Sequence, residues 1–157
     1  MNTLLRALLI GATVTLGATA WAQVKVDNAW ARATVPGQKA TGAFMKLTAA
    51  QATQLVGVST PVAGVAEIHE MKMDGGVMKM RAMPVLDLPA NQAVELKPGS
   101  YHLMLMDLKA PLAKDASVAL TLTFKDARGV QSQQLVTVPV ATGMPQAAMH
   151  EHGAHKH

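Results

Sequence analysis

The sequence contains no cysteine, although methionine is abundant. Without cysteine, a chain cannot form disulfides, use a thiolate as a nucleophile or bind a metal through thiolate sulfur. Blue-copper electron transfer also needs a cysteine ligand, so it is excluded as well. The sulfur chemistry of this chain therefore rests on its 11 methionines.

Aromatic residues make up only 3% of the chain and charged residues 15%. The net charge is +4, but the basic residues are scattered rather than gathered into a stripe, which gives nucleic-acid binding little support. A length of 157 residues favours a single domain.

The N-terminal segment predicts export. Arg6 precedes an apolar stretch over residues 7–20, and Ala20-Trp21-Ala22 has the small-x-small pattern of a signal-peptidase site. We expect a signal peptide over residues 1–22, cleaved after Ala22. Because no later segment approaches about 20 apolar residues, we expect no stable membrane insertion after cleavage.

Residues 23–141 read as one all-β domain, an antiparallel β-sandwich or Greek-key barrel. Alternation is clearest where Val118, Leu120, Leu122 and Phe124 share one face of a strand. Turn residues separate the short strands expected at 23–33, 42–48, 54–60, 66–73, 77–83, 93–97, 101–109, 118–125 and 131–140.

Residues 142–157 show no strand pattern and predict a flexible tail rich in methionine and histidine. The tail is a candidate secondary copper site, capturing Cu(II) or raising the local copper concentration. Its candidate ligands are Met144, Met149, His150, His152, His155 and His157.

The segment from Glu67 to Met83 alternates histidine, methionine and polar residues around Asp74-Gly75-Gly76, which predicts a hairpin. A turn centred on Asp74-Gly75 puts His69 opposite Met80 and Met71 opposite Met78. A turn centred on Gly75-Gly76 puts Met80 opposite Met71 and leaves His69 and Met80 as diagonal neighbours. Either register gathers imidazole and thioether groups on one face.

A second segment repeats this chemistry, because His102, Met104 and Met106 alternate along one strand and share a face. Thioether sulfur is soft and selects Cu(I) over harder ions, and imidazole also suits copper. Such a set holds and releases copper by ligand exchange, so we assign no catalytic group and expect a protein that is not an enzyme.

Other interpretations remain open at this point. Alternating methionine often marks a core face, which would leave a β-sandwich interaction module, and we place Met45 in the core on that ground. A copper oxidase with an N-terminal histidine is a further alternative, but the predicted mature terminus is Gln23. Glu67, Glu70 and Asp107 are expected to be solvated rather than to bind metal.

The spacing resembles the motif of the PCu(A)C periplasmic copper chaperones. His69 is followed by ten residues and Met80, and then by twenty-one residues and His102-Leu103-Met104. The resemblance extends to the stretches DNAWARATVPGQKATGAFM and LKPGSYHLMLMDLK. It implies a cupredoxin-like fold and Cu(I) bound by His69, Met80, His102 and Met104, with Met71 as an optional methionine.

The resemblance also implies a periplasmic location and delivery of copper to the CuA centre of cytochrome c oxidase, sometimes alongside a Sco-type protein. Some relatives carry a C-terminal extension like that of residues 144–157. Copper buffering or resistance stays open as an alternative to delivery.

Overall fold

The computed structural model describes residues 24–145, and all regular structure within this range is β. The predicted signal peptide and most of the predicted tail lie outside the described residues. Over residues 24–145 no helix is long and apolar enough to cross a membrane. The ten strands are β1 Val24–Arg32, β2 Ala40–Ala49, β3 Thr53–Ser59, β4 Ala63–Asp74, β5 Val77–Met83, β6 Leu86–Leu88, β7 Ala93–Leu96, β8 His102–Leu108, β9 Ser117–Asp126 and β10 Gln131–Ala141.

Every strand expected from the sequence forms, with ends that differ by up to three residues. The strand that the sequence did not predict is β6, which pairs with β3 at Leu86 and Leu88. It lies between Pro84 and Pro89 and is too short for an alternating pattern to be recognised. Tertiary pairing with β3, rather than local pattern, therefore creates this strand.

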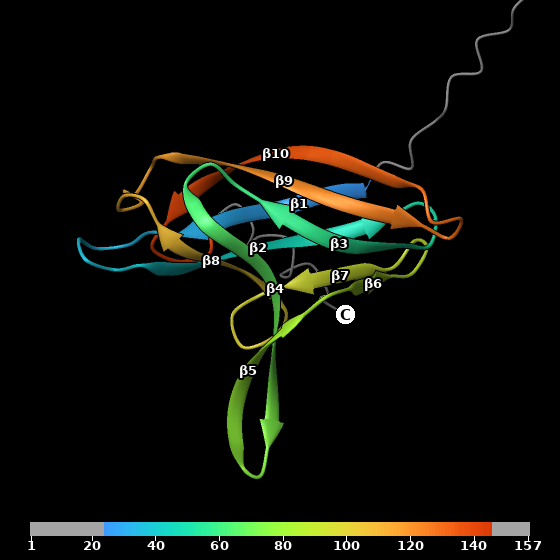
Figure 1. The fold of residues 1–157 in the computed structure, drawn as a ribbon, viewed down its shortest axis with the longest axis horizontal. Helices are drawn as coiled ribbons and strands as arrows, with labels where there is room; N and C mark the ends of the chain where they lie inside the picture. The colour runs from blue at the N-terminus through green and yellow to red at the C-terminus, as the bar shows by residue number, and fades with distance from the viewer. Residues whose placement is uncertain (1–23, 146–157) are drawn as a thin grey trace, which may run out of the picture.

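The strands follow the order β5-β4-β8-β2-β1-β10-β9-β3-β6, with β7 paired to β2 beside this path. They curl into two layers, and in Figure 1 β10 and β9 lie at the top of the body with β7 and β6 below. The fold class is confirmed, but the expectation of purely antiparallel pairing is wrong for the pairing of β1 with β10. Ala31 and Arg32 of β1 pair with Val140 and Ala141 of β10 in parallel.

A bulge in β1 accounts for this parallel contact. The register of β1 with β2 shifts between Asp27 and Trp30, and Asn28 has a φ of 52°. An extra residue in one strand bends that strand and increases its twist. The second half of β1 therefore reaches β10 and joins the two layers.

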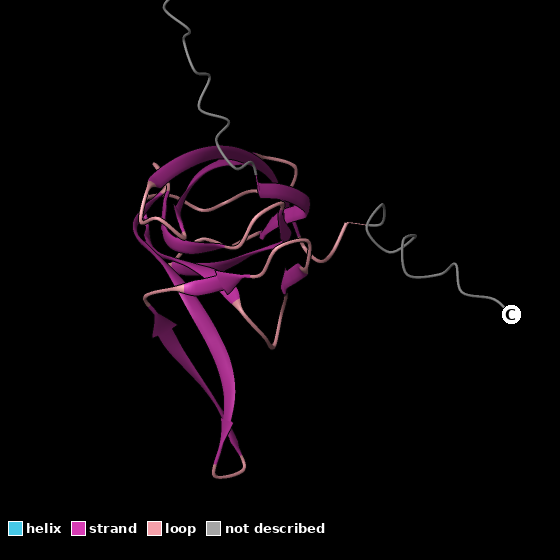
Figure 2. Ribbon diagram, turned by 90° about the vertical axis from the view of Figure 1, so that its right-hand side faces the viewer, coloured by secondary structure: helices cyan, strands magenta, loops and turns pink. Residues whose placement is uncertain are grey.

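The core lies between the two layers. The predicted inward face of β9 is confirmed, because Val118, Leu120, Leu122 and Phe124 are all buried. Met45 is buried at 2% exposure and belongs to this core, as expected. Figure 2 shows the strands wrapped around the enclosed space.

Strand β2 has two successive partners along one edge. Met45 to Thr48 pair with β7, and Ala40 to Ala43 pair with β8. Between β7 and β8 the chain leaves β2 in the loop 97–101, where Gly99 has a φ of 82° that favours glycine. His102 is the first residue after this loop, so it lies at the edge of the body.

Strand β4 continues past the body and forms a projecting hairpin with β5 (Figures 1 and 2). Gly75 and Gly76 are the two central turn residues, with φ values of 58° and 81°. A tight hairpin turn of this kind needs positive φ at both central positions, and glycine adopts positive φ with less strain than aspartate. The Asp74-Gly75 register is therefore wrong, and Met71 lies opposite Met80 while Met73 lies opposite Met78.

Candidate metal centre

The pairing of β4 with β8 brings the two folded-domain histidines together. His69 and His102 are direct partners across these strands, and their ring centroids lie 5.8 Å apart. Each residue is only 7% exposed. Two imidazoles from segments far apart in the sequence therefore meet where the hairpin joins the body.

Met80 reaches His102 from the hairpin. Its Sδ lies 3.2 Å from Nε2 of His102, although the two residues belong to β5 and β8, which are not neighbours in the sheet. On the other side of His69, Ala82 is the cross-strand partner, which leaves Met80 diagonal to His69. The sequence indicated only that Met80 is near His69, whereas the structure places Met80 in contact with His102.

The imidazole of His102 is oriented by the loop before it. Nδ1 lies 3.1 Å from the carbonyl oxygen of Ser100. Because a carbonyl oxygen can only accept, Nδ1 carries the proton, and in the neutral ring Nε2 keeps its lone pair. The same carbonyl accepts a 3.2 Å hydrogen bond from the backbone N–H of Met71, so one oxygen ties His102 to the hairpin.

His69 is oriented by Glu67, two residues earlier on β4. Nε2 of His69 donates to the carboxylate of Glu67 at 2.8 Å. Within residues 24–145, Nδ1 of His69 is a buried side-chain nitrogen with no hydrogen-bond partner. A carboxylate that fixes a histidine tautomer leaves the other ring nitrogen available to a metal, and the unpartnered Nδ1 of His69 fits this role.

Met104 and Met71 complete the surroundings. Met104 lies opposite Gly42 on β2 and opposite Glu67 on β4. A hollow of about 330 Å³ opens here, and its lining includes Met71, Met80, His102 and Met104. The side chains predicted as ligands therefore border one space, with His69 buried beside its partner His102.

Aromatic and basic side chains support this space from β1 and β2. The Phe44 ring lies between Trp30 and His102, with centroid distances of 4.8 Å and 6.4 Å. The guanidinium of Arg32 lies 5.4 Å from the centre of the Phe44 ring. A Cβ on Gly42 would lie 2.7 Å from the Phe44 ring, so only glycine leaves Phe44 in this position.

Glu67 was expected to be solvated, and its side chain is 43% exposed, while its carboxylate is also the hydrogen-bond partner of His69. Glu70 forms an ion pair with Arg81 at 2.8 Å, and Asp107 is exposed on β8. Only weak sequence signals point to Glu67 and Ser100, the two residues that orient the imidazoles. Glu67 stands two residues before a histidine on the same face, whereas the Ser100 carbonyl could be found only from the fold.

The methionines of the hairpin are not core residues. Met73, Met78 and Met80 are 59%, 44% and 48% exposed, whereas Met45 is 2% exposed. The interpretation of alternating methionine as a packed face therefore does not fit the hairpin. Within residues 24–145 no three His, Cys, Asp or Glu side chains gather as a metal site. The lining of the hollow includes the imidazole of His102 and the thioethers of Met71, Met80 and Met104.

Of the predicted tail ligands, Met144 lies within the described residues, and Met149, His150, His152, His155 and His157 lie outside them. Met144 is 42% exposed and borders a second hollow together with Trp30, Phe44 and Pro98. The start of the tail therefore passes next to the aromatic pair that supports His102.

The sequence matches the family described as "Putative lipoprotein LpqE-like" over residues 24–140. The chain belongs to the LpqE-like family. A relative named "Putative lipoprotein Lxx21020", from Leifsonia xyli subsp. xyli, is 34% identical and covers 74% of this chain and 69% of its own length. The protein RP573 of Rickettsia prowazekii is 35% identical, and the match covers 79% of this chain and 70% of that protein.

The LpqE-like chain is also similar to solved structures. The Cu(I) form of DR1885 from Deinococcus radiodurans has a TM-score of 0.61 and 33% identity, over 80% of this chain and 83% of that one. The apo PCuAC domain of PmoF1 has a TM-score of 0.60 and 24% identity, over 74% of this chain and 92% of that domain. The latter likeness shows the shared cupredoxin-like fold.

We expect the imidazole of His102 in the metal-free protein to titrate at a pKa below its ordinary value of 6.5. Burial is the main cause, and nearby His69 and Arg32 also lower the pKa, against the opposing hydrogen bond to Ser100. Just below pH 6.5, His102 therefore binds more protons in the unfolded chain than in the folded one. This contribution to the free energy of unfolding is therefore present above pH 6.5 and decreases as the pH falls.

An NMR titration of the His102 ring nitrogens in the metal-free protein measures this shift. A midpoint at or above 6.5 would contradict the expectation.

Proposed function

We propose that this protein is an exported copper chaperone that holds Cu(I) with His69, Met80, His102 and Met104. The observation that carries the proposal is the convergence of neutral donors at one place. Nε2 of His102 and Sδ of Met80 face each other at 3.2 Å, and the buried Nδ1 of neighbouring His69 has no hydrogen-bond partner among the described residues. Met71 is a secondary ligand at the rim of the same hollow.

The donor chemistry supports Cu(I) over other metals. Thioether sulfur is soft and selects Cu(I), whereas zinc is usually bound by cysteine, histidine or carboxylate. A thioether needs no deprotonation to bind. The hydrogen bonds to Ser100 and Glu67 each occupy one ring nitrogen, which leaves Nε2 of His102 and Nδ1 of His69 as the ring nitrogens for a metal. The ion would therefore be held by neutral ligands and released by simple exchange.

The comparisons support copper as the cargo. The structures similar to this chain include the Cu(I) form of DR1885 and a copper-bound PCuAC domain of PmoF2. The LpqE-like family is described as a lipoprotein family, which supports export. The signal-peptide pattern of residues 1–22 further supports release into the periplasm after cleavage at Ala22.

Copper transfer is ligand exchange, so the protein acts as a carrier and not as an enzyme. Its residues bind and orient: the Ser100 carbonyl and the Glu67 carboxylate fix the two imidazoles, and Phe44 packs beside His102. The exposed position of Met80 gives an incoming ligand access to one side of the site. An acceptor can therefore displace a thioether before it displaces a buried imidazole.

Replacing Met104 with leucine should weaken Cu(I) binding while leaving the fold intact. Loss of a residue that only supports a metal ligand typically costs about 10–100-fold in affinity, and removal of a ligand should cost at least this much. Competition with a Cu(I) chelator of known affinity measures the change. The matched control is Met106→Leu on the same strand face, outside the hollow.

X-ray absorption of the Cu(I)-loaded protein tests the ligand types directly. We expect sulfur scatterers together with nitrogen. A first coordination shell of nitrogen and oxygen alone would contradict the proposed ligand set.

The acceptor that we propose is the CuA centre of cytochrome c oxidase, in some settings with a Sco-type protein. Mixing the Cu(I)-loaded chain with an apo CuA domain should move the metal to that domain. Retention of copper by the chain, with intact Cu(I) binding, would favour buffering or resistance. A thermal melt that does not shift at excess Cu(I) would instead favour an interaction module, because a ligand that binds only the folded state must stabilise it.

We also propose that the tail captures copper and passes it to the folded domain. The support is the composition of residues 142–157 and the position of Met144 near Phe44. A chain ending at Ala141 should bind less Cu(II) than the full chain, as measured by calorimetry, and keep its Cu(I) affinity. Equal Cu(II) stoichiometry and affinity in both chains would remove the tail from the mechanism.

A further inference from the structure

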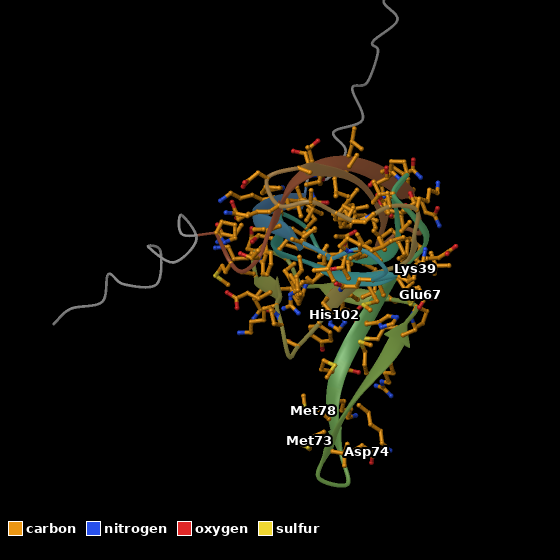
Figure 3. All side chains as sticks on the ribbon, turned by 90° about the vertical axis from the view of Figure 1, so that its left-hand side faces the viewer. Lys39, Glu67, Met73, Asp74, Met78 and His102 are labelled. Atoms are coloured by element: carbon orange, nitrogen blue, oxygen red, sulfur yellow. The ribbon has the colours of Figure 1, made fainter. Side chains whose placement is uncertain are left out.

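The projecting hairpin carries a second thioether pair that the inner site does not use. Met73 and Met78 are direct cross-strand partners next to the turn. They are 59% and 44% exposed. Figure 3 shows both on the part of the hairpin beyond the body, whereas His102 lies where the hairpin meets the body.

The two faces of this hairpin differ in chemistry. Because cross-strand partners share a face, Met71, Met73, Met78 and Met80 lie on one side. The other side is polar, with ion pairs between Lys79 and Asp74 at 2.7 Å and between Arg81 and Glu70 at 2.8 Å. These ion pairs link the two strands, while the methionine face is formed by thioethers alone.

The exposure of Met73 and Met78 has no explanation in packing. Burial of apolar surface stabilises a fold, so a methionine that packs in a core should be covered. Over the described residues, the hydrophobic core cluster and the side chains packed against it include neither Met73 nor Met78. Two exposed sulfurs held directly opposite each other instead provide a pair of soft donors for a metal.

This pair lies on a direct line to the inner site. Residues two apart on a strand are separated by about 6.6 Å, so Met73 and Met78 stand one side-chain step outside Met71 and Met80. Met80 in turn contacts Nε2 of His102. A row of thioether pairs therefore runs from the tip of the hairpin to the buried imidazoles.

We propose that Met73 and Met78 form an outer Cu(I) site through which Cu(I) enters and leaves the inner site. This inference rests on the proposed function. Each step exchanges one ligand at Cu(I) for another, first thioether for thioether along the hairpin and then thioether for the lone pair of an imidazole nitrogen at the inner site, without electron transfer. Two thioethers hold Cu(I) more weakly than the inner set with its imidazoles, so the outer pair loads second and empties first.

Methyl NMR of the full chain, titrated with Cu(I) without oxygen, tests the outer site. The first equivalent should shift the methyl signals of Met80 and Met104, and further Cu(I) should shift those of Met73 and Met78 together. Residue-specific signals separate this event from any binding to the tail. Met73 and Met78 signals that stay fixed beyond the first equivalent would overturn the proposal.

The double variant Met73→Leu/Met78→Leu tests the pathway, since it keeps apolar side chains and removes both sulfurs. We expect its equilibrium affinity for the first Cu(I) to stay within about twofold of the original, because the inner ligands are unchanged. The rate at which bicinchoninate removes Cu(I) should fall severalfold, and stopped-flow absorbance measures this rate. The matched control is Val77→Leu, which alters an equally exposed residue on the opposite face of the same hairpin.

An unchanged removal rate in the double variant would overturn the outer pathway. Failure of the original chain to bind a first Cu(I) would instead overturn the proposed function, so the two failures are distinct. Circular dichroism of the double variant checks that the hairpin substitution leaves the fold intact. Should the variant fail to fold, the methyl titration of the original chain still decides whether the outer site exists.

Discussion

The pairing of β4 with β8 is the constraint on which the candidate site depends. Its register places His69 directly opposite His102, and a shift of one residue would turn each imidazole to the other face of the sheet. The buried Ile68 and Leu103, also paired in this register, lie on the core side. The hydrophobic core therefore fixes the register, and the register fixes the two histidines.

Strand β4 serves two roles because it extends beyond the residues that pair with β8. Its first part pairs with β8 and packs against the core, and its last part forms the hairpin with β5. The hairpin carries Met80 back to His102, so a ligand from an exposed element meets ligands from a buried one. This combination suits a carrier: the imidazoles are held firmly by the fold, while the thioethers remain accessible to exchange.

The hydrogen bonds to the two imidazoles decide which ring nitrogens are available to a metal. The carbonyl of Ser100 and the carboxylate of Glu67 each occupy one ring nitrogen, which defines the nitrogen left for a metal. Burial, His69 and Arg32 lower the pKa of His102 against the opposing hydrogen bond to Ser100, so the surroundings favour its neutral ring. A neutral ring has the lone pair that a metal needs, so the surroundings of His102 suit the proposed role of its Nε2 as a ligand.

The sequence by itself determined the strand pattern, the donor types and the spacing of the proposed ligands. Alternating residues such as Leu120 and Leu122 identify buried faces, and the absence of cysteine leaves imidazole and thioether as the soft donors. Only the tertiary structure decided which hairpin register forms, because both glycine-containing turns fit the local pattern. Positive φ at Gly75 and Gly76 selects one of them.

The contact of the Ser100 carbonyl was likewise beyond the sequence, whereas Glu67 left a weak local signal two residues before His69. The Ser100 contact depends on where a loop carbonyl falls once β4, β8 and the loop 97–101 are packed together. A pattern along one strand specifies which face a side chain occupies. It does not specify which atom from a distant segment meets that side chain, since that is set by long-range pairing.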